Sequence, residues 1–151
     1  MANMLIKSSL TIIALAAALN AHAQSNGESA NELLQEADAV FRHLDNGQIR
    51  VVWNGAAKFV KDRIEREKFE TGILEARKKL GTVNRRGWAQ ITRIIYKNAL
   101  ELPDGLYANI DYATTLATGA NVFEKLSFRL EDDGRWHFTG YVPRQEQGAV
   151  Q

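Results

Sequence analysis

The 151-residue sequence contains no cysteine, and it has only two prolines and three histidines. Without cysteine the chain can form no disulfide, hold no metal through thiolates, use no cysteine nucleophile and carry no lipid on an N-terminal cysteine. Its stability must therefore come from a hydrophobic core. The histidines give no metal-ligand spacing, because His43 is predicted on a helix and His137 on a distant strand. We expect neither a metal nor another cofactor.

Long apolar runs are also missing. The longest, Leu10–Leu19, has about ten residues, whereas a membrane-spanning helix needs roughly 20. With Lys7 before this run and Ala21-His22-Ala23 after it, residues 1–23 are typical of a secretory signal peptide. The alternative is an uncleaved amphipathic anchor. We expect cleavage near Ala23 and a periplasmic or secreted protein with no stable membrane anchor.

Charge of one sign does not dominate either. Lys7 is the only charged side chain within residues 1–23, so residues 24–151 keep 18 of the 19 basic residues beside all 18 acidic ones, and their net charge is zero. This balance argues against nucleic acid as the main partner, and equally against electrostatic binding to a membrane.

Helical periodicity dominates the first half, after a polar leader at residues 24–29. Three helices are predicted, at Ala30–Asp45, at Ile49–Val60 and from about residue 67 to Leu80. Ser29 is suited to cap the first helix, and Gly47 and Gly81 are suited to end the first and third. Gly55 lies inside the second helix, where it either allows a close approach or weakens the helix.

Alternation dominates the second half and predicts four strands. The first lies within Asn84–Asn98, where either a bulge near Arg93 changes the face or both faces are covered. The second is Leu106–Leu116. The last two form a hairpin, Val122–Val142, whose apolar faces match only with a three-residue turn, Asp132–Gly134. That register predicts the pairs Leu130 with Trp136 and Phe128 with Phe138.

These elements predict one α+β domain over residues 30–144, followed by a polar tail at residues 145–151. The three helices would pack on the apolar face of a curved four-stranded antiparallel sheet. A sheet that wraps around helices leaves a cone-shaped interior with room for a small pocket.

Several short motifs carry a resemblance to a known family over about Ala30–Arg144. They are Trp53, Arg66-Glu67-x-Phe69, Leu80-Gly81, Asp104-Gly105-x-Tyr107, Glu124 and Asp133-Gly134-Arg135-Trp136-x-Phe138-x-Gly140-Tyr141. In order and spacing they resemble the bacterial family catalogued as domain of unknown function 4019. Phe69 departs from it, because an indole is common there. The resemblance implies no activity. The order of elements is similar to nuclear-transport-factor-2-like and cystatin-like α+β domains, which include enzymes, ligand binders and interaction modules.

Glu124 is the sharpest candidate for a functional residue, because it is a carboxylate on the apolar face of the hairpin. It would bind a ligand or act as an acid or base, or else a neighbouring hydroxyl of Thr114 or Tyr112 satisfies it. The candidate ligand pocket is Glu124, Tyr112, Trp53 and Trp136, although such aromatics more often form core. No catalytic residue is assigned.

Other polar residues are weaker candidates. Asp111 and His137 fall on the outer face of the sheet, among mixed charges, which argues against a catalytic pair. Arg85-Arg86 would grip an acidic ligand or lie at the surface.

Three functions therefore compete. We expect a non-catalytic exported module that binds a small apolar ligand or a protein. The alternative is a hydrolase or isomerase using Glu124 and Tyr112. The third is a structural protein that forms a homodimer through the outer sheet face, where Phe123, Tyr107 and Tyr141 are predicted.

Overall fold

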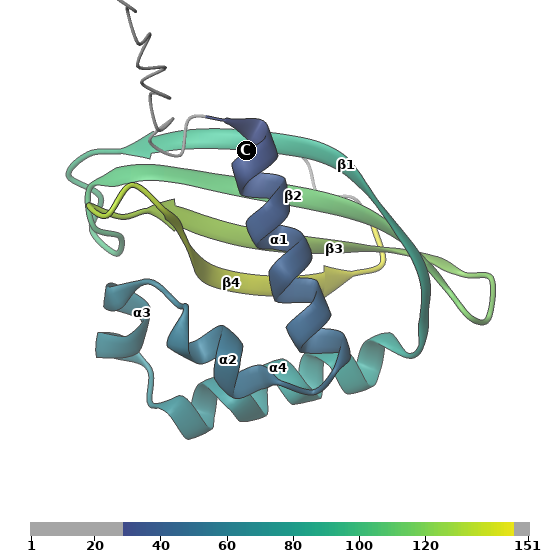
Figure 1. The fold of residues 1–151 in the computed structure, drawn as a ribbon. Helices are drawn as coiled ribbons and strands as arrows, with labels where there is room; N and C mark the ends of the chain where they lie inside the picture. Colours follow the sequence, from purple (N-terminus) through teal and green to yellow (C-terminus); the bar gives the residue numbers. More distant parts are fainter. Residues whose placement is uncertain (1–28, 147–151) are drawn as a thin grey trace, which may run out of the picture.

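The computed structural model describes residues 29–146, in which four helices precede four strands. The helices are α1 (Ala30–Asp45), α2 (Ile49–Asn54), α3 (Lys58–Arg63) and α4 (Arg66–Leu80), and the strands are β1 (Val83–Tyr96), β2 (Gly105–Leu116), β3 (Asn121–Leu130) and β4 (Trp136–Arg144). Neighbouring strands are antiparallel, in the order β1-β2-β3-β4 (Figure 1). The predicted α+β class is confirmed. The signal peptide and most of the leader and tail lie outside the described residues.

The predicted helix ends are confirmed where the capping chemistry is strong. The Ser29 hydroxyl accepts a hydrogen bond from the Asn31 backbone N–H at 3.1 Å and caps α1. Gly47 follows α1 with φ +69°, and Gly81 ends α4 with φ +92°. Both values are in the region that favours glycine, so these two positions stop the helices at little cost.

The predicted second helix is wrong in its length. It breaks after Asn54 into α2 and α3, which gives four helices instead of three. The cause lies in the sheet, because Ala56 bridges to Phe138 on the open edge of β4 and the Ala57 N–H donates to the Phe138 carbonyl at 2.8 Å. Pairing with a strand edge is incompatible with helical backbone, and Gly55 stands at the break.

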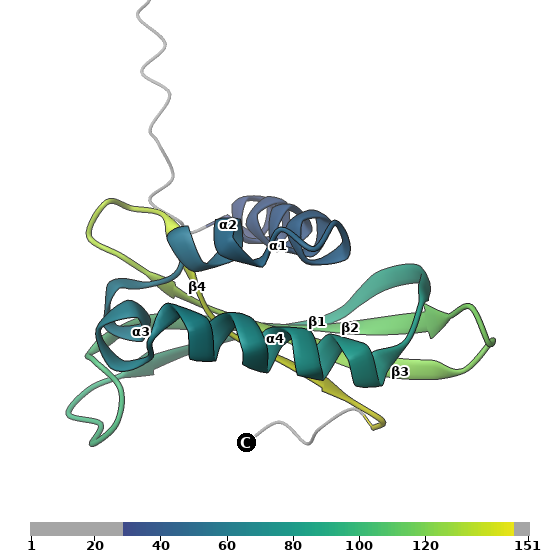
Figure 2. The ribbon, with the colours of Figure 1, turned by 90° about the horizontal axis from the view of Figure 1, so that it is seen from below.

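The sheet is open, and it does not form the expected cone. In Figure 1, α1 crosses one face of the sheet while α4 runs along the β4 side, and Figure 2 shows α1 and α2 together on one side. Because α1 lies over the face while α4 lies along the β4 side, the helices do not form a bundle that the sheet could wrap around. The core lies between this helical layer and the sheet, with Leu33, Phe41, Ile110, Leu126 and Phe128 among its most buried residues.

The register of the final hairpin is confirmed near its turn. Leu130 pairs with Trp136, and Phe128 pairs with Phe138. The Glu131 N–H donates to the Arg135 carbonyl at 3.0 Å, which closes the three-residue turn, and Gly134 has φ +74°. Placing both apolar sets on one face was therefore sufficient to locate the turn.

Strand β1 has two register shifts, between Val83 and Arg85 and between Trp88 and Gln90, and both lie earlier than the bulge predicted near Arg93. The second shift is the bulge that changes the face of the strand. Before it, Trp88 pairs with Tyr112 and shares the helix-facing side. After it, Ile91 pairs with Ile110 and takes over that side. The extra residue therefore reverses the parity of β1, which explains why the sequence has no clean alternation there.

Candidate functional site

Glu124 lies on β3, faces the helices and has no exposed surface. The Thr114 hydroxyl on β2 donates a hydrogen bond to its Oε1 at 2.7 Å. Of the two hydroxyls proposed as partners, Thr114 is therefore the donor. Tyr112 lies opposite Glu124 in the register, but its hydroxyl makes no hydrogen bond to any described residue.

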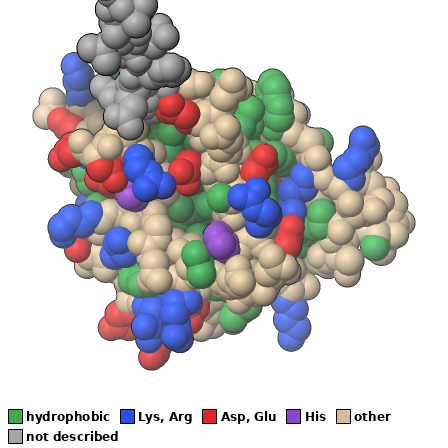
Figure 3. Space-filling view, viewed as in Figure 1, with side chains coloured by type: hydrophobic (Ala, Val, Ile, Leu, Met, Phe, Trp, Pro, Cys, Tyr) green, Lys and Arg blue, Asp and Glu red, His purple; other side chains and the backbone are tan. Residues whose placement is uncertain are grey.

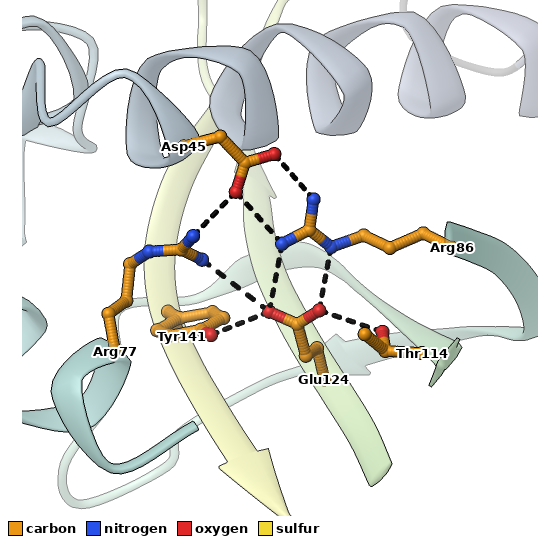
Figure 4. Close-up of polar contacts among 6 residues, drawn as sticks. All are labelled: Asp45, Arg77, Arg86, Thr114, Glu124 and Tyr141. Atoms are coloured by element: carbon orange, nitrogen blue, oxygen red, sulfur yellow. Dashed lines mark hydrogen bonds and ion pairs between the residues drawn. The ribbon is translucent and has the colours of Figure 1, made fainter. Parts of the chain in front are cut away.

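Two arginines also contact Glu124 (Figure 4). Arg86 of β1 places Nε 2.6 Å from Oε1, and Arg77 of α4 places Nη1 3.7 Å from Oε2. Asp45, the last residue of α1, joins the same arginines, with Arg77 Nη2 at 2.5 Å and Arg86 Nη1 at 2.6 Å. Two acids and two bases thus balance in one cluster. Together with Thr114 and Tyr141, whose hydroxyls bind Glu124, they form what we call the charge network.

The charge network also solves a local problem of α1. A carboxylate at a helix C-terminus opposes the helix dipole. Burial by itself raises the pKa of Asp45, but hydrogen bonds and charges from Arg86 and Arg77 outweigh burial and hold that pKa below its usual value. Burial lowers the pKa of Arg86, and its contacts with Asp45 and Glu124 more than reverse this. These shifts keep Asp45 and Arg86 charged, and the ion pairs of the network connect α1 and α4 to the sheet.

Tyr141 is a member of the charge network that the sequence reasoning placed on the wrong face. Its hydroxyl donates to Glu124 Oε2 at 2.6 Å. Register shifts between Ser127 and Phe128, so that Ser127 pairs with Gly140 and Phe128 with Phe138, which leaves Thr139 as an extra residue in β4. This bulge turns Tyr141 inward. Glycine inside a strand often marks a bulge, so Gly140 was the available signal.

The same bulge turns Val142 toward solvent, where it is 47% exposed. It also weakens the basis for an outer-face dimer. Tyr141 leaves that face, and Tyr107 is buried, with its ring 5.2 Å from that of Tyr96 and 6.3 Å from that of Phe59. Phe123 is left half-buried there. The homodimer itself stays a prediction.

Arg86 was underrated as half of a surface pair. Its side chain is only 12% exposed, and its Cζ lies 4.0 Å from the centre of the Phe41 ring. Arg85 is exposed, as the alternation of a strand requires of its neighbour. Nothing in the local sequence separates the two arginines, because their roles depend on which face of β1 is covered.

A hollow of about 360 Å³ adjoins the charge network between α1 and β1. It is lined by Asp38, Phe41 and Arg42 of α1, Gly87 and Trp88 of β1 and Tyr112 of β2, with Asp45 and Arg86 at its side. We call it the α1–β1 hollow. Trp88 is 57% exposed, and a Cβ added to Gly87 would meet nothing within 4 Å, so the β1 side is open.

Tyr112 is the unusual residue of the α1–β1 hollow. It is 3% exposed, yet its hydroxyl has no partner among residues 29–146. The Phe41 ring packs edge-on against it at 4.8 Å and holds it in place. Burial first, and the charge of Asp38 second, raise the pKa of Tyr112, so the phenol stays protonated and able to donate.

The four residues predicted to form a pocket do not all meet. Glu124 and Tyr112 are opposite each other on β3 and β2. Trp53 instead packs 5.2 Å from the ring of Phe69, and Trp136 is buried opposite Leu130. Leu130 lies six residues along β3 from Glu124, which is about 20 Å at the rise of a strand. Only Tyr112 of the four lines the α1–β1 hollow.

Asp111 and His137 do not form a pair. Asp111 lies opposite Lys125 and forms an ion pair with Arg144. His137 Nε2 lies 2.9 Å from Asp133 Oδ2, and its Nδ1 lies 3.2 Å from the Gly55 carbonyl oxygen. His43 Nδ1 contacts Gln48 Oε1 at 2.8 Å. Within residues 29–146 no three His, Asp or Glu side chains are grouped as metal ligands.

Comparison with known families supports the resemblance noted in the sequence. A model of the family described as "Protein of unknown function (DUF4019)" matches residues 36–141, which is more than half of the chain. The chain belongs to this family. The match includes Asp45, Arg77, Arg86, Glu124 and Tyr141, and it also includes the α1–β1 hollow. No curated protein and no solved structure matches the chain, so the similarity to nuclear-transport-factor-2-like domains is not confirmed.

No helix in the described part of the chain is both long enough and apolar enough to cross a membrane.

Proposed function

We propose that this protein is an exported module that binds a small ligand in the α1–β1 hollow without transforming it. The observation that carries the proposal is the Tyr112 hydroxyl, which is buried, protonated and without a hydrogen-bond partner among the described residues. Buried polar groups in folded proteins nearly always have hydrogen-bond partners, and a buried polar group without one lowers stability by about 1–3 kcal/mol. A bound ligand that accepts this hydrogen bond would remove that cost.

Glu124 supports a non-catalytic role. An acid or base must reach the proton it transfers, but Glu124 has no exposed surface and both its oxygens already accept hydrogen bonds from Arg86, Thr114 and Tyr141. The lining of the α1–β1 hollow includes Asp45 and Arg86 but not Glu124, and both lining residues are engaged in the charge network. The charge network is therefore suited to stabilising the fold rather than to proton transfer.

Export is supported by the sequence of residues 1–23. If the proposal holds, protein recovered from the periplasm or medium has a mass that begins at Gln24. Recovery of the full 151-residue mass from the cytoplasm or membrane would contradict export.

Ligand binding can be tested by native mass spectrometry of the exported protein. We expect an added mass on the wild type, its loss or strong reduction on Tyr112→Phe, and its retention on Tyr96→Phe, which removes a hydroxyl outside the hollow. Because bound ligand stabilises the native state, a thermal-shift screen with small molecules provides a second readout. A bare wild-type protein whose melting temperature responds to no compound would overturn the proposal.

A further inference from the structure

We infer that the ligand of the α1–β1 hollow is a neutral polyhydroxylated ring, such as the sugar ring of a disaccharide. This inference rests on the proposed function and specifies it. Three features of the hollow carry it: an exposed aromatic platform, a balance of opposite charges, and hydrogen-bonding groups that have no other described partner.

Trp88 supplies the platform. It lies on β1, which is an edge strand, and pairs with Tyr112, so its indole stands on the same face as the buried phenol. Its 57% exposure leaves a large apolar surface in contact with water. Tryptophan has a flat apolar ring system with a polar N–H, so it suits a ligand that has one apolar face and polar groups around its edge. A sugar ring has such an apolar face, formed by its C–H groups.

The charges around the hollow cancel. Asp38 and Arg42 stand one turn apart on α1, while Asp45 and Arg86 neutralise each other. Positive and negative side chains are also interspersed over much of the face that Figure 3 shows. An anionic ligand would meet two carboxylates here, and a cationic ligand would meet two guanidinium groups, so neither sign is favoured.

The polar groups that line the hollow require a ligand with both hydrogen-bond donors and acceptors. The Asp38 carboxylate only accepts, the Arg42 guanidinium only donates, and the Tyr112 hydroxyl can do both. Asp38 and Arg42 are exposed, and their side chains make no hydrogen bond or ion pair with another residue in the described part of the chain. Adjacent hydroxyls on one ring can satisfy all three groups. An apolar ligand, which the sequence favoured, would desolvate Asp38 and Arg42 without replacing their water.

The test is a titration of the full exported chain followed by heteronuclear NMR of the Trp88 indole N–H and the Gly87 amide. The probes are cellobiose and diacetylchitobiose as neutral disaccharides, galacturonate as an anion, choline as a cation and indole as an apolar ring. We expect a neutral disaccharide to shift both signals. Trp88→Ala should weaken that binding about ten-fold or more, and Asp38→Asn should weaken it also. Ile95→Ala, which truncates another exposed apolar residue of β1, should leave it unchanged.

The outcomes separate the two proposals. Shifts of Trp88 and Gly87 caused by galacturonate, choline or indole but by neither disaccharide would overturn the sugar inference and leave the hollow as a binding site. Disaccharide binding that survives Trp88→Ala would overturn the assigned platform. If neither disaccharide shifts Trp88 or Gly87, the sugar inference fails, and the native mass spectrum then decides the proposed function on its own evidence.

Discussion

Replacing Glu124 by glutamine is the most informative perturbation of this fold. The amide keeps the shape of the side chain but removes its charge and places an N–H₂ group among donors. Arg86, Thr114 and Tyr141 now lie at 2.6, 2.7 and 2.6 Å from the carboxylate oxygens. Some of these donors would lose their acceptor inside a site with no exposed surface.

The expected loss of stability follows from that burial. Breaking a buried ion pair by removing one partner costs about 3–5 kcal/mol, against a total stability of about 5–15 kcal/mol for a domain. With a urea m-value of roughly 1.5–2 kcal/mol/M, the unfolding midpoint should fall by about 2 M. Urea unfolding at neutral pH, followed by circular dichroism, measures this directly.

Two companion variants serve as controls for Glu124→Gln. Glu75→Gln makes the same chemical change on the exposed side of α4 and should change stability by less than about 0.5 kcal/mol. Tyr141→Phe keeps its ring and removes one hydrogen bond to a charged acceptor, which should cost about 1.5–3 kcal/mol. It also covers the case in which Glu124→Gln does not fold. If Glu124→Gln and Glu75→Gln lost the same stability, the charge network would not be what holds the helices to the sheet.

Three further predictions follow from the same contacts. The pKa of Asp45 is lower in the folded state than its unfolded value of about 3.9. Its charge therefore stabilises the fold above that value, and this stabilisation is lost as the pH falls through the folded pKa. Asp45→Asn should make the free energy of unfolding decline less steeply in acid, and an unchanged acid profile would contradict this. Burial, together with the charge of Glu124, raises the pKa of Tyr141, so its phenol should ionise only as the chain unfolds. An alkaline ultraviolet titration with Tyr141→Phe as control measures this, and ionisation of Tyr141 in the native state would refute the assignment. Gly134→Ala should destabilise the fold by about 1–2 kcal/mol, because φ is +74° there. Gly72→Ala, inside α4 with open space around it, should stabilise the fold by about 0.5–1 kcal/mol. The melting temperatures of the two variants should therefore shift in opposite directions.

The sequence was sufficient for features that depend on neighbouring residues. The caps at Ser29, Gly47 and Gly81 were predicted because their chemistry acts within one turn of a helix. The turn at Asp132–Gly134 followed from matching two apolar faces across a few residues, and Glu124 stood out as the one charge on that face. These are local or short-range constraints, and each has a strong energetic signature.

The sequence did not predict the members of the charge network other than Glu124 and Thr114, because their contacts are long-range. Arg86 and Asp45 are 41 residues apart, and Tyr141 enters only because β4 bulges at Thr139. A bulge reverses the parity of every residue beyond it, so one misplaced insertion moves Tyr141 and Val142 to the wrong faces. The break of the second helix at Gly55 depends likewise on a distant strand edge.

The sequence alone thus determined the α+β class, the order of helices before strands and the inward position of Glu124. Tertiary structure decided that Glu124 is held by Thr114, Tyr141 and two arginines, and that Tyr112 and Trp88 share a hollow away from Trp53 and Trp136. The physical reason is that periodicity reports which face a residue occupies, whereas partners in an ion pair or a hollow depend on register between elements far apart in the chain.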